Sequence, residues 1–161
     1  MKEIAEVAAD PYSDAMSLAL YALAPRAKSR AELQIQLRKR GVAAEIASAV
    51  LDSLELQGLL NDLEFAQLWM ESRRRQKRLS VSAITQELRS KGVAQDIIDE
   101  VMQGSDLDAE YQMAFEMAER KYRSCAHLDH MVIYRRINSL LARKGFSHQI
   151  TERIMRELLA S

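Results

Sequence analysis

A six-residue phrase occurs three times in this chain, as LRKRGV at 37–42, LRSKGV at 88–93 and LARKGF at 141–146. The copies stand about 50 residues apart, a period that is typical of proteins built from tandem structural units. In each copy a glycine follows a basic stretch, and glycine commonly closes a helix because it adopts the left-handed conformation without strain. The phrase therefore predicts a helix end that recurs with a copied structural unit.

Apolar residues on both sides of this glycine recur at helical spacing in all three copies. Aligned on the glycine, the matching positions are Leu33, Ile84 and Ile137; Leu37, Leu88 and Leu141; Val42, Val93 and Phe146; Ile46, Ile97 and Ile150; and Val50, Val101 and Ile154. Residues four positions apart lie on one face of a helix, so each copy predicts a helix, a glycine turn and a second helix. Ser29 and Glu32 open the first copy in the pattern of a capping box.

A third helix is predicted before each pair, at residues 12–24, at 62–75 and roughly at 106–122. Asp10 and Pro11 are typical of an N-cap and a first helical residue. The apolar residues expected to face the core of the second and third units are Phe65, Ala66, Trp69 and Met70, and Tyr111, Ala114, Phe115, Ala118 and Tyr122.

The predicted fold is therefore all-α, with three tandem three-helix units in an elongated, curved array. The expected boundaries are a tail at 1–11 and units at 12–58, 59–104 and 105–161. Composition agrees, because the chain has only five glycines and two prolines and is rich in strong helix formers.

Charge and composition limit the possible function. With 23 basic and 23 acidic residues the net charge is zero, which does not favour a surface devoted entirely to nucleic acid. The longest uncharged apolar stretch, around 15–24, is too short to span a membrane, and the acidic N-terminus lacks the pattern of a secretory signal. A single cysteine, Cys125, fits a reducing compartment, and we expect a cytoplasmic protein.

The sequence predicts a binding protein rather than an enzyme. No two glycines are close enough to form a phosphate-cradling loop, and no hydrolase or metalloprotease motif is present. Cys125, His127 and His130 are the one cluster of possible metal ligands, but their spacing is not a usual zinc pattern and a fourth ligand is missing nearby. We therefore expect no catalytic residue, no metal site and no cofactor, and interpret this segment as a polar loop.

The basic residues allow two interpretations. At helix ends they complement the helix macrodipole, which by itself explains why they recur with the phrase. Residues 73–78, RRRQKR, are different, because five cations in six positions repel one another and a helix end needs only one or two. Contact with an anionic partner is the functional alternative to a solvated charge run. The candidate contact residues are Arg73, Arg74, Arg75, Lys77 and Arg78 in this run, with Arg38, Lys39, Arg40, Arg89, Lys91, Arg135, Arg136, Arg143 and Lys144 elsewhere.

The central part of the chain reads LLNDLEFAQLWMESRRR at 59–75 and ITQELRSKGV at 84–93. These two stretches resemble the RecX family of regulators of the RecA recombinase. The outer copies, SRAELQIQLRKRGV at 29–42 and INSLLARKGFSHQI at 137–150, are similar to the outer modules of that family.

Two local departures from the family accompany this resemblance. Arg78-Leu79-Ser80 stands where family members often have a glycine, and Asn61-Asp62 replaces a common acidic pair.

The resemblance implies a three-unit helical protein that lies along the groove of RecA filaments on single-stranded DNA. There it would inhibit ATP hydrolysis, strand exchange and the co-protease role of RecA, and so act as a negative regulator of recombination and of the SOS response. Such a protein needs no cofactor, and we expect a monomer with at most weak direct binding to DNA. The alternative is a helical array that acts on nucleic acid directly, with its helix–glycine–helix units used like helix-turn-helix modules.

Overall fold

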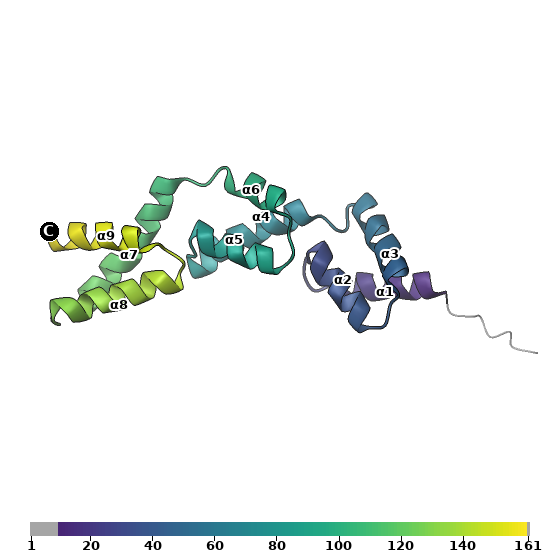
Figure 1. The fold of residues 1–161 in the computed structure, drawn as a ribbon, viewed down its shortest axis with the longest axis horizontal. Coiled ribbons are helices and arrows are strands. Elements are labelled where there is room, and N and C mark those ends of the chain that lie inside the picture. The colour runs from purple at the N-terminus through teal and green to yellow at the C-terminus, as the bar shows by residue number, and fades with distance from the viewer. Residues whose placement is uncertain (1–9, 161) are drawn as a thin grey trace, which may run out of the picture. The chain divides into compact units, whose positions relative to one another are not determined.

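The computed structural model describes residues 10–160, which form helices joined by short turns and loops and contain no strand. The helices are α1 (Pro11–Leu23), α2 (Arg30–Lys39), α3 (Ala44–Leu56), α4 (Asp62–Ser72), α5 (Val81–Ser90), α6 (Gln95–Met102), α7 (Leu107–Cys125), α8 (His130–Arg143) and α9 (His148–Ala160). The all-α prediction and the three helix–glycine–helix pairs are confirmed (Figure 1). The tail predicted at 1–11 lies outside the described residues as far as residue 9.

Two compact units make up the described chain, and they do not follow the sequence repeat. The first runs to Phe65 and also includes Lys91–Ala94, the turn between α5 and α6, while the second contains the remaining residues. The predicted boundaries at 58/59 and 104/105 stay a prediction.

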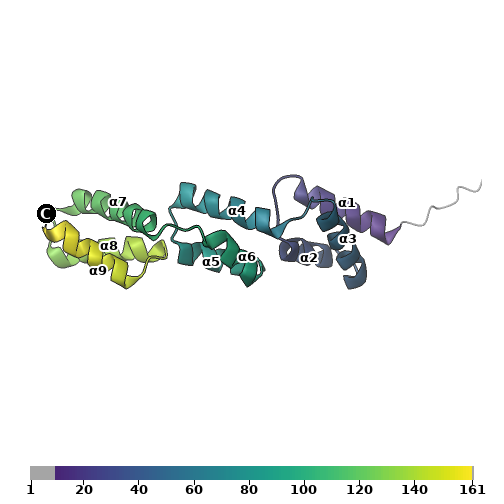
Figure 2. The ribbon, with the colours of Figure 1, turned by 90° about the horizontal axis from the view of Figure 1, so that it is seen from above.

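In the first unit α1, α2 and α3 pack as a three-helix bundle (Figure 2). Its core is made of small and aliphatic side chains, which are Ala15, Ala19, Ala22, Leu33, Leu37, Ala47, Val50, Leu51, Leu54 and Leu60. The capping box predicted at Ser29 is confirmed, since the Glu32 amide donates to Ser29 Oγ and the Ser29 amide donates to the Glu32 carboxylate, both at 3.1 Å. Asp10 caps α1 by accepting from the Tyr12 amide.

In the second unit α7, α8 and α9 pack around another core, which is larger and contains aromatic residues. Its buried members are Tyr111, Ala114, Met117, Ala118, Cys125, Ile133, Ile137, Leu141, Phe146, Ile154, Met155 and Leu158. The predicted alignment is only approximate in one column. Ile46, Ile97 and Ile150 are half-buried, because the residue that follows each of them takes the fully buried place on the helix.

The three phrase glycines, Gly41, Gly92 and Gly145, have φ values of 81°, 74° and 87°. Each follows a helix end, as predicted. In the first copy the Val42 amide returns to the Leu37 carbonyl at 3.1 Å, the bond that defines a Schellman-type helix end. The helix-stop interpretation of the phrase is thereby confirmed.

The phrase glycines also have contacts that the repeat did not predict. In the first unit the Lys91-Gly92 turn lies against the start of α2, where Ser29 Oγ donates to the Lys91 carbonyl at 2.6 Å and Lys91 Nζ pairs with Glu32 at 2.8 Å. A Cβ on Gly92 would collide with the Cβ of Ala31. Gly92 is therefore required by a close approach as well as by its φ.

The second unit repeats this arrangement with other residues. The Lys144-Gly145 turn lies against the start of α5, where the Ser80 amide donates to the Lys144 carbonyl at 2.9 Å. A Cβ on Gly145 would stand 2.6 Å from the Cβ of Ala83. Gly41, by contrast, has no such neighbour within 4 Å. The second and third copies of the phrase thus dock on a helix start, and the first does not.

At each of these two contacts, between a glycine turn and a helix start, a carboxylate also accepts a hydrogen bond from the first amide of the helix. Asp62, in the first turn of α4, accepts from the Arg30 amide at 2.8 Å, and Glu110, in the first turn of α7, accepts from the Val81 amide at 3.0 Å. Both amides are the first of their helix and have no partner inside it. The starts of α2 and α5 are therefore capped by residues that lie far away along the chain.

Candidate anion-binding surfaces

The central basic run does not continue α4 to Arg75 as predicted. The α-helix ends at Ser72, and Arg73–Lys77 form a π-helical turn. Such turns are rare, and they are frequent at functional sites. The run is therefore displayed on a wider helical turn than the sequence pattern indicated.

Arg73 is bound inside the second unit. Its Nε lies 2.7 Å from Glu87 Oε2, and its guanidinium stacks on the Trp69 ring with 4.0 Å between the guanidinium carbon and the ring centroid. Trp69 Nε1 donates to the same carboxylate oxygen at 2.8 Å. Only 19% of the Arg73 side chain is exposed. Its main contacts are therefore with Glu87 and Trp69 inside the protein and not with an outside partner.

Arg78 ends the π turn in the left-handed conformation, with φ 51° and ψ 44°. It is the only non-glycine residue with positive φ in the described chain. Its guanidinium is 3.2 Å from Glu116, so one of the five positive charges of the run is paired within the protein. Arg74 has two shielded guanidinium nitrogens that lack an acceptor.

Arg75 and Lys77 are the two exposed basic side chains of the run without a hydrogen-bond or ion-pair partner among the described residues. The self-repulsion of five cations is therefore partly relieved within the protein, by Glu87 and Glu116. Direct contact with an outside anion is open chiefly to these two exposed side chains.

The basic residues at the other helix ends also fall into two groups, those with a partner inside the protein and those without one. Lys91 pairs with Glu32, Arg89 Nε donates to Gln95 at 2.8 Å, and Lys144 Nζ donates to the Lys77 carbonyl at 2.7 Å. The first copy differs, because Arg38, Lys39 and Arg40 are exposed and have no side-chain partner in the described part of the chain.

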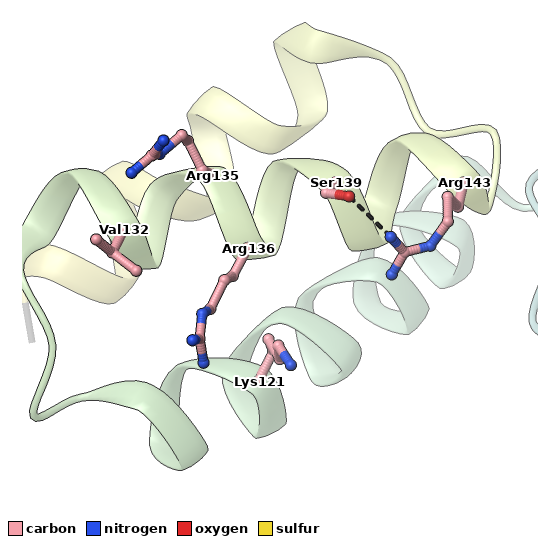
Figure 3. A pocket seen from close by; sticks show the side chains of 6 residues that line it. All are labelled: Lys121, Val132, Arg135, Arg136, Ser139 and Arg143. Carbon is pink, nitrogen blue, oxygen red and sulfur yellow. Dashed lines mark hydrogen bonds between the residues drawn. The ribbon is translucent and has the colours of Figure 1, made fainter.

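A further group of cations without an ion-pair partner lies between α7 and α8. A hollow of about 430 Å³ is lined by Lys121 from α7 and by Val132, Arg135, Arg136, Ser139 and Arg143 from α8. Figure 3 shows Arg136 reaching from α8 toward the helix that carries Lys121, while Arg143 donates to Ser139 Oγ at 2.8 Å. No carboxylate lines this hollow, so its charge is available to an outside anion.

Lys121 and its neighbour Arg120 were not among the predicted contact residues. Arg120 and Lys121 line an adjoining hollow of about 400 Å³ with Met117, Ser124 and Leu140. A run along the chain is visible in a sequence, but a cluster made across two packed helices is not. The short basic stretch ERKYR at 119–123 was the available signal.

Within residues 10–160 no three His, Cys, Asp or Glu side chains are grouped as metal ligands would be. Cys125 is buried and its thiol donates to the Lys121 carbonyl at 3.0 Å. None of the described helices is both long and apolar enough to cross a membrane.

These features define a class of all-helical protein, built from three-helix modules, with cationic side chains exposed on its surface. Sequence models of the first, second and third three-helix domains of RecX match residues 15–54, 61–102 and 108–155. The chain belongs to the RecX family.

Known relatives agree with this assignment over most of the chain. "Regulatory protein RecX" of Streptomyces coelicolor is 37% identical over 93% of this chain and 80% of its own length. The protein of the same name from Mycobacterium avium is 39% identical over 91% and 86%. The crystal structure of RecX from Lactobacillus salivarius has a TM-score of 0.82 at 22% identity, covering 95% of this chain and 99% of that one, and so has the same fold.

Proposed function

We propose that this protein binds RecA filaments on single-stranded DNA and inhibits the ATPase, strand-exchange and co-protease activities of RecA. It would thereby act as a negative regulator of homologous recombination and of the SOS response. The observation that carries this proposal is the match, in order, of all three RecX domains to one chain. The name of the relatives, "Regulatory protein RecX", supports a regulatory role.

The proposed contact with the filament uses the α7–α8 hollow first. Lys121, Arg136 and Arg143 lie around one concavity that no acidic side chain lines. Several cations that face one groove bind a phosphate backbone by releasing its counterions. Arg75 and Lys77 offer a second, smaller contact on the π turn.

The test is the rate of ATP hydrolysis by RecA on single-stranded DNA, measured with and without this protein. We expect inhibition at protein concentrations where naked DNA of the same sequence is hardly bound. An unchanged rate across concentrations that saturate the filament would contradict the proposal. Sedimentation of the free protein checks the accompanying expectation that it is a monomer.

Two variants with the same change in net charge compare the contact surfaces. Arg135→Glu with Arg136→Glu alters the α7–α8 surface, and Arg75→Glu with Lys77→Glu alters the π turn. All four side chains are exposed, so each substitution should change stability by no more than about 0.5 kcal/mol. We expect the first pair to weaken inhibition more, and an equal or opposite order would refute the ranking.

A second candidate function is direct binding to nucleic acid without RecA. The observation that favours it is the same α7–α8 hollow with its unpaired cations. A protein that binds DNA alone through such contacts should lose orders of magnitude in affinity for naked DNA as salt rises. Tight, salt-sensitive binding to naked DNA with no added affinity for the filament would favour this alternative.

A further inference from the structure

Three hollows that the proposed function does not use follow one another around α2 in the first unit. The first, of about 150 Å³, lies between α1 and α2. Its floor contains the buried Leu33 and Leu37, and its rim contains Tyr21, Lys28 and Arg40. Side chains of the core thus form the floor of a small concavity with a basic rim.

Two further hollows continue from the first. One of about 390 Å³ shares Lys28 and Gln36 with it and is also lined by Ile35 and Lys39. The next, of about 270 Å³, shares Ile35 with the second and is otherwise lined by Gln34, Arg38, Val42, Ala44 and Ala47. We use the name "α2 groove" for these three hollows together.

Large apolar side chains stand exposed along the α2 groove. Tyr21 is 80% exposed and Ile35 is 45% exposed, although both line its hollows. Exposed apolar side chains beside concavities, within a polar rim, are typical of a surface that another protein covers.

The charge of the α2 groove has one sign. Lys28, Arg38, Lys39 and Arg40 have no side-chain hydrogen bond or ion pair within residues 10–160. Glu32 is the only acid in the lining, and its carboxylate is held by Arg26 and Lys91. Partial burial, together with nearby Arg26, lowers the pKa of Lys28. A carboxylate placed next to Lys28 would therefore stabilise its charged form.

We propose that the α2 groove docks an acidic segment of a partner protein that inserts a bulky apolar side chain beside Tyr21. The apolar floor recognises that side chain, and the four uncompensated cations recognise the flanking carboxylates. This inference does not require the partner to be RecA, so it stands or falls separately from the proposed function.

Nucleic acid fits the α2 groove less well than a peptide does. Single strands bind on aromatic platforms that stack successive bases, and Tyr21 is the only aromatic residue lining these hollows. The floor is aliphatic, with Leu18, Leu33 and Leu37 in the first hollow. In the α7–α8 hollow, by contrast, Val132 is the only apolar residue, so the two surfaces differ in kind.

The experiment selects random peptides of about 12 residues on the full-length protein, a length that fits groove-binding segments. We expect selected sequences rich in Asp and Glu around a Leu, Phe or Trp. The tightest peptide is then measured by fluorescence anisotropy against Tyr21→Ser with Arg40→Glu, which should weaken binding by about tenfold or more. The control is Leu56→Ser with Arg156→Glu, which removes an apolar residue that is 90% exposed and an exposed cation outside every hollow described above.

Circular dichroism establishes that both variants keep the parent's helical content. If the groove pair does not fold, Lys39→Glu, an exposed single change, takes its place in the same assay. Selected peptides without acidic bias, or equal losses in the groove and control variants, would overturn the proposal. Displacement of the peptide by an oligothymidylate would assign the α2 groove to nucleic acid, and a dimer broken by Tyr21→Ser would assign it to a second copy; either also overturns the proposal.

Discussion

Replacing Gly92 with alanine tests the joint at the start of α2 more sharply than any other single change. The substitution adds one methyl group to a turn whose φ is 74° and whose Cβ position is already occupied by Ala31. Gly41→Ala is its matched control, because Gly41 belongs to the same unit, has φ 81° and faces open space.

The two substitutions share one energetic cost and differ in another. A left-handed conformation costs a non-glycine residue about 1–2 kcal/mol, and both variants bear this cost. Gly92→Ala must in addition displace the start of α2, and forced overpacking typically costs about 1–3 kcal/mol. We therefore expect free energies of unfolding lowered by about 1–2 kcal/mol for Gly41→Ala and about 2–5 kcal/mol for Gly92→Ala.

Urea unfolding followed by circular dichroism measures this difference, with Ala31→Gly as the second arm of a double-mutant cycle. Alone, Ala31→Gly should destabilise by about 0.5–1 kcal/mol, because glycine weakens a helix. Combined with Gly92→Ala it should recover much of the steric loss, giving a coupling energy of about 1–3 kcal/mol. Equal losses for Gly41→Ala and Gly92→Ala, or strictly additive effects in the cycle, would refute the docking argument.

Two further predictions concern single side chains. Arg78→Gly should be more stable than Arg78→Ala by about 1 kcal/mol in urea unfolding, since both lose the exposed pair with Glu116 but only glycine relieves the positive φ; the reverse order would show that the backbone there is not strained. Burial alone would raise the pKa of Glu32, but hydrogen bonds from Arg26, Lys91 and the Ser29 amide outweigh it and lower the pKa from 4.5 to about 2. A lowered folded-state pKa stabilises the protein above pH 4.5 and loses that contribution as the pH falls toward 2, so Glu32→Gln should flatten the pH dependence of the unfolding free energy in this window, and a parallel profile would contradict it.

The parts of the fold that a sequence can predict here are those set by residues close together along the chain. Helix periodicity, the Ser29 capping box and the positive φ of the phrase glycines all depend on neighbours within a few positions, and each is confirmed. The π turn at Arg73–Lys77 was missed, because nothing in its local pattern distinguishes five helix-forming residues in a π turn from the same residues in an α-helix.

The candidate sites were harder to predict, because the role of a cation depends on where the nearest carboxylate lies after folding. Arg73 reaches Glu87, 14 positions away, and Arg78 reaches Glu116, 38 positions away. A sequence run therefore overstates the charge available to a partner. It also misses clusters such as Lys121 with Arg136, which exist only because α7 packs on α8.

The three copies of the phrase show how position in a series changes what the same residues do. In the second and third copies the lysine before the glycine has a partner. Lys91 forms an ion pair with Glu32, and Lys144 donates a hydrogen bond to the Lys77 carbonyl. In the first copy no helix start lies against Gly41, and the basic residues before it have no partner in the described chain. Because a copied helix end keeps its charge whether or not a neighbour neutralises it, all three cations of the first copy, Arg38, Lys39 and Arg40, stay unpaired in the described chain, and they border the α2 groove.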